Sequence, residues 1–316
     1  MFRNYLTTAL RNLRKEKTFT FINTFGLALG VACVLLITLF VRHEWSFDAF
    51  HDKSDRLYRA WGKEDWGEGR EFFYTVTPVV LAPTLEETIP EVESTVRVRD
   101  LNALVGPEKN RFTESIRMVD TTFFDVFDFE LLEGGQVFAN PNSVVVTPRI
   151  ARKYFGTTPA IGQSLSIEID GEPQDFLVTG IVREPRAESS IRFDLLIPFT
   201  KAHDFMGPQA MTSWFNVMVE TYVLLQDGAA GVEAKLPAMI RQVLGDEADR
   251  SGYRLGLQPI TDIHLNTEYP AGIEPISTPV FSYMLGAVAL LVLIVGSINF
   301  VTLSIGQSVR RAGEVG

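Results

Sequence analysis

Two long apolar runs interrupt a chain that is otherwise polar. Residues 19–41 contain no Asp, Glu, Lys or Arg, and a second uncharged run covers residues 279–305. A helix rises about 1.5 Å per residue, so about 20 apolar residues cross the hydrocarbon core of a bilayer. The pattern therefore predicts transmembrane helices at 19–41 and 279–305. They bracket a section, residues 42–278, that is too polar to enter the bilayer.

The first run is predicted to be retained rather than cleaved. It is longer than the apolar part of a signal peptide, 18 residues precede it, and a small-residue cleavage site does not follow it. Within residues 1–18, Phe2, Ala9 and Leu13 recur at helical spacing with arginine and asparagine between them. We expect a cytoplasmic amphipathic helix there, lying on an anionic inner leaflet. The alternative is a short basic flank that only sets the topology.

The middle section changes to the patterns of short strands and short helices. Alternation with period two and short apolar runs predict the strands, and periodic apolar positions with capping residues predict the helices. Thr147 can cap a helix that begins at Pro148. The expected strands are 94–99, 164–170, 176–182 and 217–225, with a hairpin turn at 171–173, and the expected helices are 77–89, 228–245 and a short one from 148.

These elements mix without a regular βαβ rhythm, which favours an α+β fold. The predicted fold class is a membrane protein with two transmembrane helices flanking a mixed α/β extracytoplasmic domain. The 237 residues of the middle section suffice for a substantial core in two subdomains. Residues 61–66, which are acidic and aromatic, are predicted to form an exposed loop.

Charge sets the expected orientation. Residues 1–18 carry five basic residues and one acidic residue, and the C-terminal tail carries Arg310 and Arg311 against Glu314. Residues 42–278 hold 22 basic and 37 acidic residues. The positive-inside rule therefore places both termini in the cytoplasm and the middle section outside. The net charge of −10 and pI near 5.0 exclude a basic nucleic-acid-binding surface.

The sequence predicts a protein without catalytic residues, metal ligands or cofactors. It contains none of the motifs GxxxxGK[ST], HExxH and GxSxG, so it should not hydrolyse ATP itself. One cysteine and four scattered histidines do not make a metal site. Acidic residues and histidines gather just after the first run: His43, Glu44, Asp48, His51, Asp52 and Asp55. Their spacing matches no standard ligand set, so we favour a solvated stretch at the membrane exit, where Trp45, Phe47 and Phe50 form an aromatic belt; a metal or proton site is the alternative.

Small and amide residues suggest where the helices pack. Gly26 and Gly30 form a GxxxG pair in the first run, and Asn299 lies in the second. Small residues let helices approach closely, and a buried amide in lipid prefers a partner on another helix. We expect these three residues at helix–helix contacts, although glycine is also common in membrane helices.

Several stretches, in order and spacing, resemble ABC transporter permeases of the MacB/FtsX type. Their first helix resembles residues 4–30, and the start of their extracytoplasmic domain resembles residues 46–59. Further similar stretches are residues 119–127, 141–147, 151–156, 161–163, 260–265, 299–301 and 310–316. The resemblance implies a MacB-like periplasmic core domain at 42–278 and the start of a cytoplasmic coupling loop at 306–316.

The resemblance also implies a function. Such a permease transmits motion driven by a separate ABC ATPase subunit to the extracytoplasmic domain, for export or extraction of a substrate. Arg310, Arg311 and Glu314 would begin the contact with the ATPase. The implied location is the bacterial inner membrane, as a multi-pass protein in contact with lipid. The implied partners are a second copy or a second permease half, and a periplasmic adaptor.

Relatives have four or eight membrane spans, so we expect this chain to be a fragment or a truncated product. The substrate is not predicted. A different class of protein has the same plan of two spans around an outer domain: sensor kinases and chemoreceptors. A heptad pattern after the second span would favour that alternative, and a neighbouring ATPase gene would favour the permease.

Overall fold

The computed structural model describes the backbone of residues 17–315, and their side chains except at 19–20, 303–304 and 306–315. The amphipathic helix predicted for residues 1–18 lies outside the described residues, apart from 17–18. The described residues form two compact units: residues 17–45 with 278–315, and residues 46–277. We call the first the helix pair and the second the domain.

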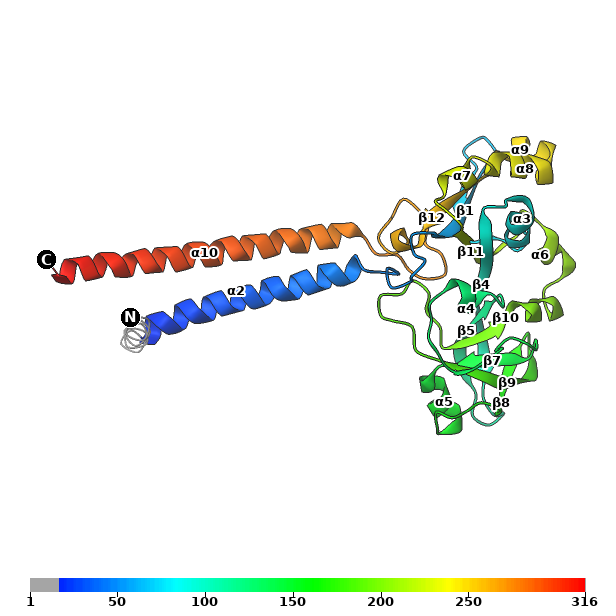
Figure 1. The fold of residues 1–316 in the computed structure, drawn as a ribbon, viewed down its shortest axis with the longest axis horizontal. Coiled ribbons are helices and arrows are strands. Elements are labelled where there is room, and N and C mark those ends of the chain that lie inside the picture. The colour runs from blue at the N-terminus through cyan, green and yellow to red at the C-terminus, as the bar shows by residue number, and fades with distance from the viewer. Residues whose placement is uncertain (1–16, 316) are drawn as a thin grey trace. The chain divides into compact units, whose positions relative to one another are not determined.

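The helix pair consists of α2 (Lys17–Glu44) and α10 (Pro279–Val315), which lie side by side (Figure 1). Both are long and apolar enough to cross a membrane, with a mean hydropathy of 2.5 in Phe21–Glu44 and in Pro279–Thr302. Helix α10 continues through residues 306–315, where a loop was expected. These residues contain no proline, and isolated glycines lower helix propensity by about 1 kcal/mol each without ending a helix.

The domain is built on one 12-stranded mixed sheet. Along its main path the strands follow the order β12-β1-β11-β4-β5-β10-β7-β9-β6. Neighbours are antiparallel except β10 with β5 and β7 with β9, which are parallel. The strands are β1 (Leu57–Asp65), β2 (Glu71–Tyr74), β3 (Thr77–Pro78), β4 (Val92–Val105), β5 (Phe112–Val119), β6 (Leu131–Gly134), β7 (Ser143–Val146), β8 (Ser164–Ile169), β9 (Glu172–Val182), β10 (Leu195–Pro198), β11 (Val217–Leu225) and β12 (Arg254–Pro259).

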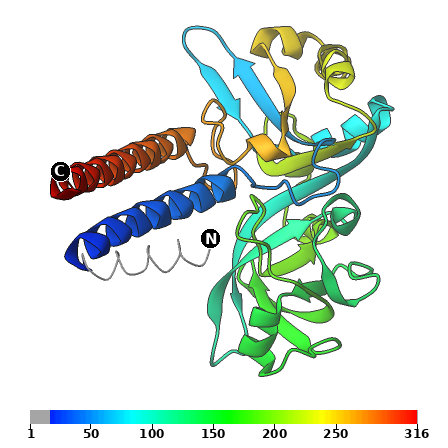
Figure 2. The ribbon, with the colours of Figure 1, turned by 60° about the vertical axis from the view of Figure 1, so that its left-hand side comes forward.

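Short helices cover the two ends of this sheet, so that the domain has two lobes that share it (Figure 2). One lobe holds β12, β1 and β11, and the other holds β5, β10, β7 and β9, as the labels in Figure 1 show. The α-helices of the domain are α3 (Leu81–Thr88), α4 (Phe123–Val126), α5 (Pro148–Phe155), α6 (Pro208–Thr212), α7 (Ala230–Glu233), α8 (Leu236–Leu244) and α9 (Asp246–Ser251), and the 3-10 helices are η1 (Phe199–Asp204) and η2 (Ile260–Asp262).

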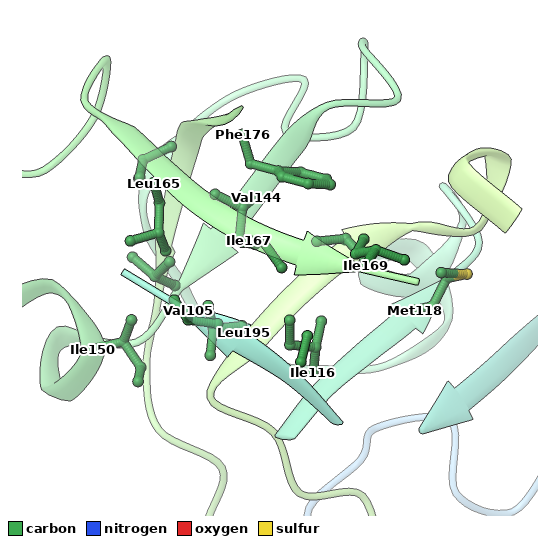
Figure 3. Packing of buried hydrophobic residues seen from close by; sticks show 14 of the residues in the cluster. Val105, Ile116, Met118, Val144, Ile150, Leu165, Ile167, Ile169, Phe176 and Leu195 are labelled. Carbon is green, nitrogen blue, oxygen red and sulfur yellow. The ribbon is translucent and has the colours of Figure 1, made fainter. Parts of the chain in front are cut away.

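Three apolar clusters form the core. The cluster in Figure 3 packs side chains from β4, β5, β7–β10 and α5, including Ile116, Ile167 and Phe176. A second cluster is rich in phenylalanine, with Phe123, Phe127 and Phe193 among its members. A third lies against α3 and α8 at the other end of the sheet. Apolar residues on the strands contribute to all three clusters, together with side chains from the short helices and from loops.

Several predicted elements match and others need correction. The strand at 217–225 has the predicted bounds, β4 and β9 include the strands predicted at 94–99 and 176–182, and β8 ends one residue before the end predicted for the strand at 164–170. Residues 77–78 form a short strand before α3. The helix predicted at 228–245 is divided into α7 and α8, and Pro237 lies in the first turn of α8, where its missing N–H breaks no helical hydrogen bond. Helix α5 begins at Pro148 as predicted, but the Thr147 hydroxyl faces Asp194 Oδ1 at 3.4 Å instead of capping the helix.

The exposed loop predicted at residues 61–66 is wrong. Residues 61–65 belong to β1, which pairs with β2 and β12. The Glu64 side chain is buried, and its carboxylate accepts hydrogen bonds from Tyr74 Oη at 2.6 Å and Trp66 Nε1 at 2.7 Å, which offset the cost of burial. Polar residues that find such partners can occupy a strand interior, and composition alone does not reveal the partners.

Candidate coupling sites

Two glycines of α2 lie at its contact with α10. A Cβ atom added to Gly26 would lie 3.9 Å from Asn299 Nδ2, and one added to Gly30 would lie 3.7 Å from Val292 Cγ1. Both distances are ordinary van der Waals contacts. The two glycines therefore line the surface at which the helices meet, and Gly26 lies next to Asn299.

Polar side chains of the helix pair are satisfied unequally. Thr38 Oγ1 donates to the Val34 carbonyl at 2.8 Å, and Ser297 Oγ donates to the Leu293 carbonyl at 2.7 Å. Both bonds stay within one helix. Asn23 Oδ1, by contrast, is buried and accepts no hydrogen bond from the described residues. An amide of this kind can accept a hydrogen bond from a further helix.

The predicted ATPase-contact residues lie on the last turns of α10. The backbone is helical at Arg310, Arg311 and Glu314, and their side chains are outside the described part. Residues four apart share a helix face, so Arg310 and Glu314 are on the same face and Arg311 is offset from it. Asn299 precedes Arg310 by 11 residues, which is about 17 Å along a helix. The two predicted groups are therefore separate sites.

The domain begins with a segment, residues 46–53, that we call the N-terminal connector. Its Asp48 side chain is fully buried, and Asp48 Oδ1 accepts a hydrogen bond from the Ser190 backbone N–H at 2.8 Å. The Asp48 N–H donates to the Glu188 carbonyl at 2.9 Å. Asp48 has φ +56°, a left-handed conformation that aspartate adopts more readily than most residues. Burial raises the pKa of Asp48 to about 6, and the hydrogen bonds from Ser190 offset part of that rise.

His51 in the same connector is also buried. Its ring lies among Phe50, Phe127 and Phe129, and His51 Nδ1 accepts a hydrogen bond from the Asp128 backbone N–H at 3.1 Å. Burial lowers the pKa of His51 to about 4, and Asp128 offsets part of that fall. The solvated stretch predicted from the sequence is therefore wrong for these two residues. Within the described side chains, no group of three acidic, histidine or cysteine residues could hold a metal ion.

The domain ends with a second segment, residues 264–277, that we call the C-terminal connector. Its Tyr269 ring lies against Trp61 and Phe73, with ring centroids 6.2 and 5.7 Å away. Further along, the Ile273 backbone N–H donates to Glu220 Oε1 at 2.9 Å. This connector therefore contacts β1, β2 and β11.

A buried polar network lies under the C-terminal connector. Arg59 on β1 and Glu220 on β11 form a salt bridge of 3.1 Å, and their side chains are 2% and 5% exposed. Arg59 Nη2 also donates to Gln258 Oε1 at 2.7 Å, and Tyr222 Oη donates to Glu220 Oε2 at 2.9 Å. Burial is the main cause that raises the pKa of Tyr222 far above its usual value. Both ions are thus held by several hydrogen bonds, the condition under which a buried ion pair is tolerated.

Gly272 of the connector lies directly over this ion pair. A Cβ atom at this position would be 1.8 Å from Glu220 Oε1 and 2.6 Å from Arg59 Nη1. Real Cβ atoms do not approach so closely, so only glycine lets the connector reach the salt bridge.

A second ion pair holds the same connector to another strand. Glu274 pairs with Arg117 on β5, and the Arg117 side chain is 6% exposed. Arg117 Nε also donates to the Arg192 carbonyl at 2.9 Å. Two successive residues of the connector, Ile273 and Glu274, are therefore fixed to strands on the two sides of β4.

A pair of aromatic rings is one contact between the two connectors. Phe47 of the N-terminal connector stacks on His264 of the C-terminal connector, with centroids 3.4 Å apart and planes inclined by 1°. The Ser277 N–H donates to the His264 carbonyl at 2.7 Å. The first and last residues of the domain are therefore brought to one place.

A family model for the MacB-like periplasmic core domain matches residues 20–237, more than half of the chain. The chain belongs to this family. The match includes most of α2 and the domain as far as α8, so the MacB-like domain follows an apolar helix as the resemblance implied. Two candidate spans flank the domain by length and composition.

A solved structure shares the fold of this MacB-like domain. A domain of a protein described as a permease from Porphyromonas gingivalis superposes with a TM-score of 0.58 at 20% identity, covering 71% of this chain and 95% of its own. The periplasmic region of MacB from Actinobacillus actinomycetemcomitans gives a TM-score of 0.44 at 15% identity, with 64% and 88% covered. The extracellular domain of the noncanonic ABC-type transporter YknZ from Gram-positive bacteria gives 0.44 at 13%, with 63% and 98% covered. A search of curated proteins found no match.

Sequence reasoning missed the polar residues under the C-terminal connector of the MacB-like domain. One signal was present, because Glu220 is the only charged residue in the apolar strand 217–225. A lone charge within a buried strand requires a partner of opposite charge. Its partner Arg59 is 161 residues away in the sequence, so the pair itself could not be assigned without the fold.

Proposed function

We propose that this chain is a permease subunit of an ABC transporter and that it transmits ATPase-driven motion to its extracytoplasmic domain. The single observation that carries this proposal is the MacB-like periplasmic core domain inserted between two apolar helices. The basic ends of the sequence and the acidic middle section favour cytoplasmic termini and an outer domain. The protein would be a multi-pass protein of the bacterial inner membrane.

Helix α10 suits transmission because it is continuous. Its 37 residues correspond to about 55 Å at the rise of an α-helix. A rigid element of this length carries a displacement from one end to the other, and small shifts of helices are a common switching movement. In this proposal Arg310, Arg311 and Glu314 contact the ATPase, whereas Gly26, Gly30 and Asn299 pack helices against each other.

The chain requires partners in this function. The sequence contains no P-loop motif, so ATP hydrolysis belongs to a separate ABC ATPase subunit. A second copy or a second permease half would cover the helix pair, where the buried Asn23 Oδ1 offers an acceptor. A periplasmic adaptor is a further partner, and the cargo is a substrate that is exported or extracted.

Charge reversal at the end of α10 tests the proposal. The full chain would be purified from membranes with the ATPase that accompanies it, and ATP hydrolysis would be measured in nanodiscs. We expect Arg310→Glu with Arg311→Glu to reduce the recovered ATPase at least about tenfold, the factor for losing one charge-assisted contact. The matched control is Arg241→Glu, an exposed arginine of the domain. Recovery of an active ATPase complex with the double variant, at the level of the control, would contradict the assignment.

A further inference from the structure

The C-terminal connector crosses the sheet at its centre. It contacts Arg59 on β1, Glu220 on β11 and Arg117 on β5, and these strands follow one another in the order β1-β11-β4-β5. Strands β1 and β11 belong to one lobe, and β5 belongs to the other. A segment of 14 residues is therefore fixed to both lobes at once.

The attachment to the first lobe is built from buried charge. The Glu220 carboxylate accepts hydrogen bonds from Arg59, Tyr222 and the Ile273 backbone N–H. Separating the connector from Glu220 breaks the hydrogen bond between the Ile273 N–H and the Glu220 carboxylate. A hydrogen bond to a charged group contributes about 1.5–3 kcal/mol. Apolar packing is not directional and would not fix the position of the connector along the sheet. The hydrogen bond fixes the backbone nitrogen of Ile273 to the Glu220 side chain.

The attachment to the second lobe is the next residue. Glu274 pairs with Arg117, whose guanidinium is itself held by the Arg192 carbonyl. The residues that follow lead along the chain to Pro279, where α10 begins. Residues 275–278 therefore join the start of α10 to a point attached to both lobes.

The described hydrogen bonds of the N-terminal connector go to other parts of the domain. They reach residues 188 and 190 and residues 125 and 128, which lie outside the strands. The described hydrogen bonds of the N-terminal connector thus reach loops and α4, whereas those of the C-terminal connector include side chains on β11 and β5.

We propose that a displacement of α10 changes the relative position of the two lobes through the C-terminal connector. The connector does so because it is held by the Arg59–Glu220 pair, over which Gly272 lies, and by the Arg117–Glu274 pair. Arg59, Glu220 and Arg117 are positioning residues in this function. The inference rests on the proposed function, because it specifies where transmitted motion arrives in the domain.

Gly272→Ala tests the attachment directly. The added Cβ would overlap Glu220 Oε1, so either the connector or the carboxylate has to move, and both movements break the hydrogen bond to Ile273. In the full chain in nanodiscs, we expect amide hydrogen exchange at Ile273 to accelerate about tenfold to a hundredfold, the range for losing one hydrogen bond to a charged acceptor. Exchange in β4 and β11 should stay unchanged. The matched control is Gly228→Ala, where a Cβ meets open space.

A distance measurement tests the transmission. Spin labels at Gln242 in one lobe and Glu172 in the other, with Cys33 replaced by alanine, report on the relation between the lobes. In the complex with the ATPase that accompanies the chain, we expect a non-hydrolysable ATP analogue to change the distance distribution. Gly272→Ala should abolish that change, and Gly228→Ala should preserve it.

The outcomes separate the two proposals. Unchanged exchange at Ile273 in Gly272→Ala would overturn the attachment. Accelerated exchange with a preserved nucleotide-dependent change would overturn the inference while leaving the proposed function intact. A parent complex in which the analogue causes no change would overturn the proposed function, and the inference with it.

Discussion

The described hydrogen bonds of the N-terminal connector go to loops and to α4, whereas those of the C-terminal connector include bonds to Glu220 on β11 and Arg117 on β5. Both bury ionisable side chains, but they compensate them differently. Asp48 Oδ1 accepts a hydrogen bond from one backbone N–H, that of Ser190, and burial raises the pKa of Asp48 to about 6. Glu220 has a buried arginine at 3.1 Å. We therefore expect the stability contributed by Asp48 in the N-terminal connector to change with pH. The attachment of the C-terminal connector depends instead on a pair of opposite charges, Arg59 and Glu220.

Removing the charge of Glu220 is expected to have the largest effect. Glu220→Gln keeps the shape of the side chain but leaves the Arg59 cation buried without a counter-ion. Breaking a buried pair on one side costs about 3–5 kcal/mol. Denaturant unfolding of the domain in the full chain, followed by tryptophan fluorescence, measures the loss. The matched control is Glu130→Gln, which removes an exposed partner of Arg183 and should change little. Similar losses of unfolding free energy in Glu220→Gln and Glu130→Gln would contradict the special role given to the buried pair under the C-terminal connector.

The effect of Asp48 is smaller and depends on pH. Its pKa is raised from 3.8 to about 6 in the folded protein, so protonation stabilises the fold: this stability is complete below pH 3.8 and is lost as pH rises through about 6. Asp48→Asn stays neutral and can still accept the Ser190 hydrogen bond. Relative to the parent, the variant should gain about 2–3 kcal/mol between pH 4 and 7, at about 1.4 kcal/mol per pKa unit.

The contribution of His51 to the unfolding free energy changes with pH in the opposite direction. In the parent protein it therefore masks the pH dependence contributed by Asp48. The pKa of His51 is lowered from 6.5 to about 4, so its contribution is complete above pH 6.5 and is lost as pH falls through about 4. The contributions of Asp48 and His51 therefore oppose each other between pH 4 and 6. Unfolding curves of the parent and Asp48→Asn at several pH values check this, with Asp227→Asn as the exposed control. A constant difference between parent and Asp48→Asn over this range would refute it.

The fold class was predictable because its signals are local. Long uncharged runs identify α2 and α10, and apolar strands such as β11 are visible in short windows of sequence. The family resemblance came from short stretches whose order was preserved, and the family model supports it. The sequence also indicates the division of the helix at 228–245, because Pro237 lies within it and proline favours the first turn of a helix.

The polar sites were not predictable because their partners are distant. Residues 61–66 look like a loop, yet Glu64 is buried by Tyr74 and Trp66. Asp48 and His51 look like a solvated stretch, yet residues near 128 and 190 cover them. Burial of a charged residue is decided by groups brought together by the fold, and charge in the sequence by itself favours the exposed interpretation.

The smallest effect concerns the contact that joins the two connectors. Phe47 stacks on His264 with centroids 3.4 Å apart, and Phe47→Leu keeps an apolar side chain while removing the ring. Aromatic pairs contribute about 0.5–1.5 kcal/mol beyond burial of area, so the loss in unfolding free energy should be of that size. A double-mutant cycle with Gly272→Ala measures whether the connectors act together, because residues without shared partners give additive effects within about 0.5 kcal/mol. We expect a larger coupling than that, since His264 also accepts a hydrogen bond from Ser277 in the connector that Gly272→Ala displaces. Strict additivity would mean that the connectors are independent, and that the stacked rings do not pass a displacement of one connector to the other.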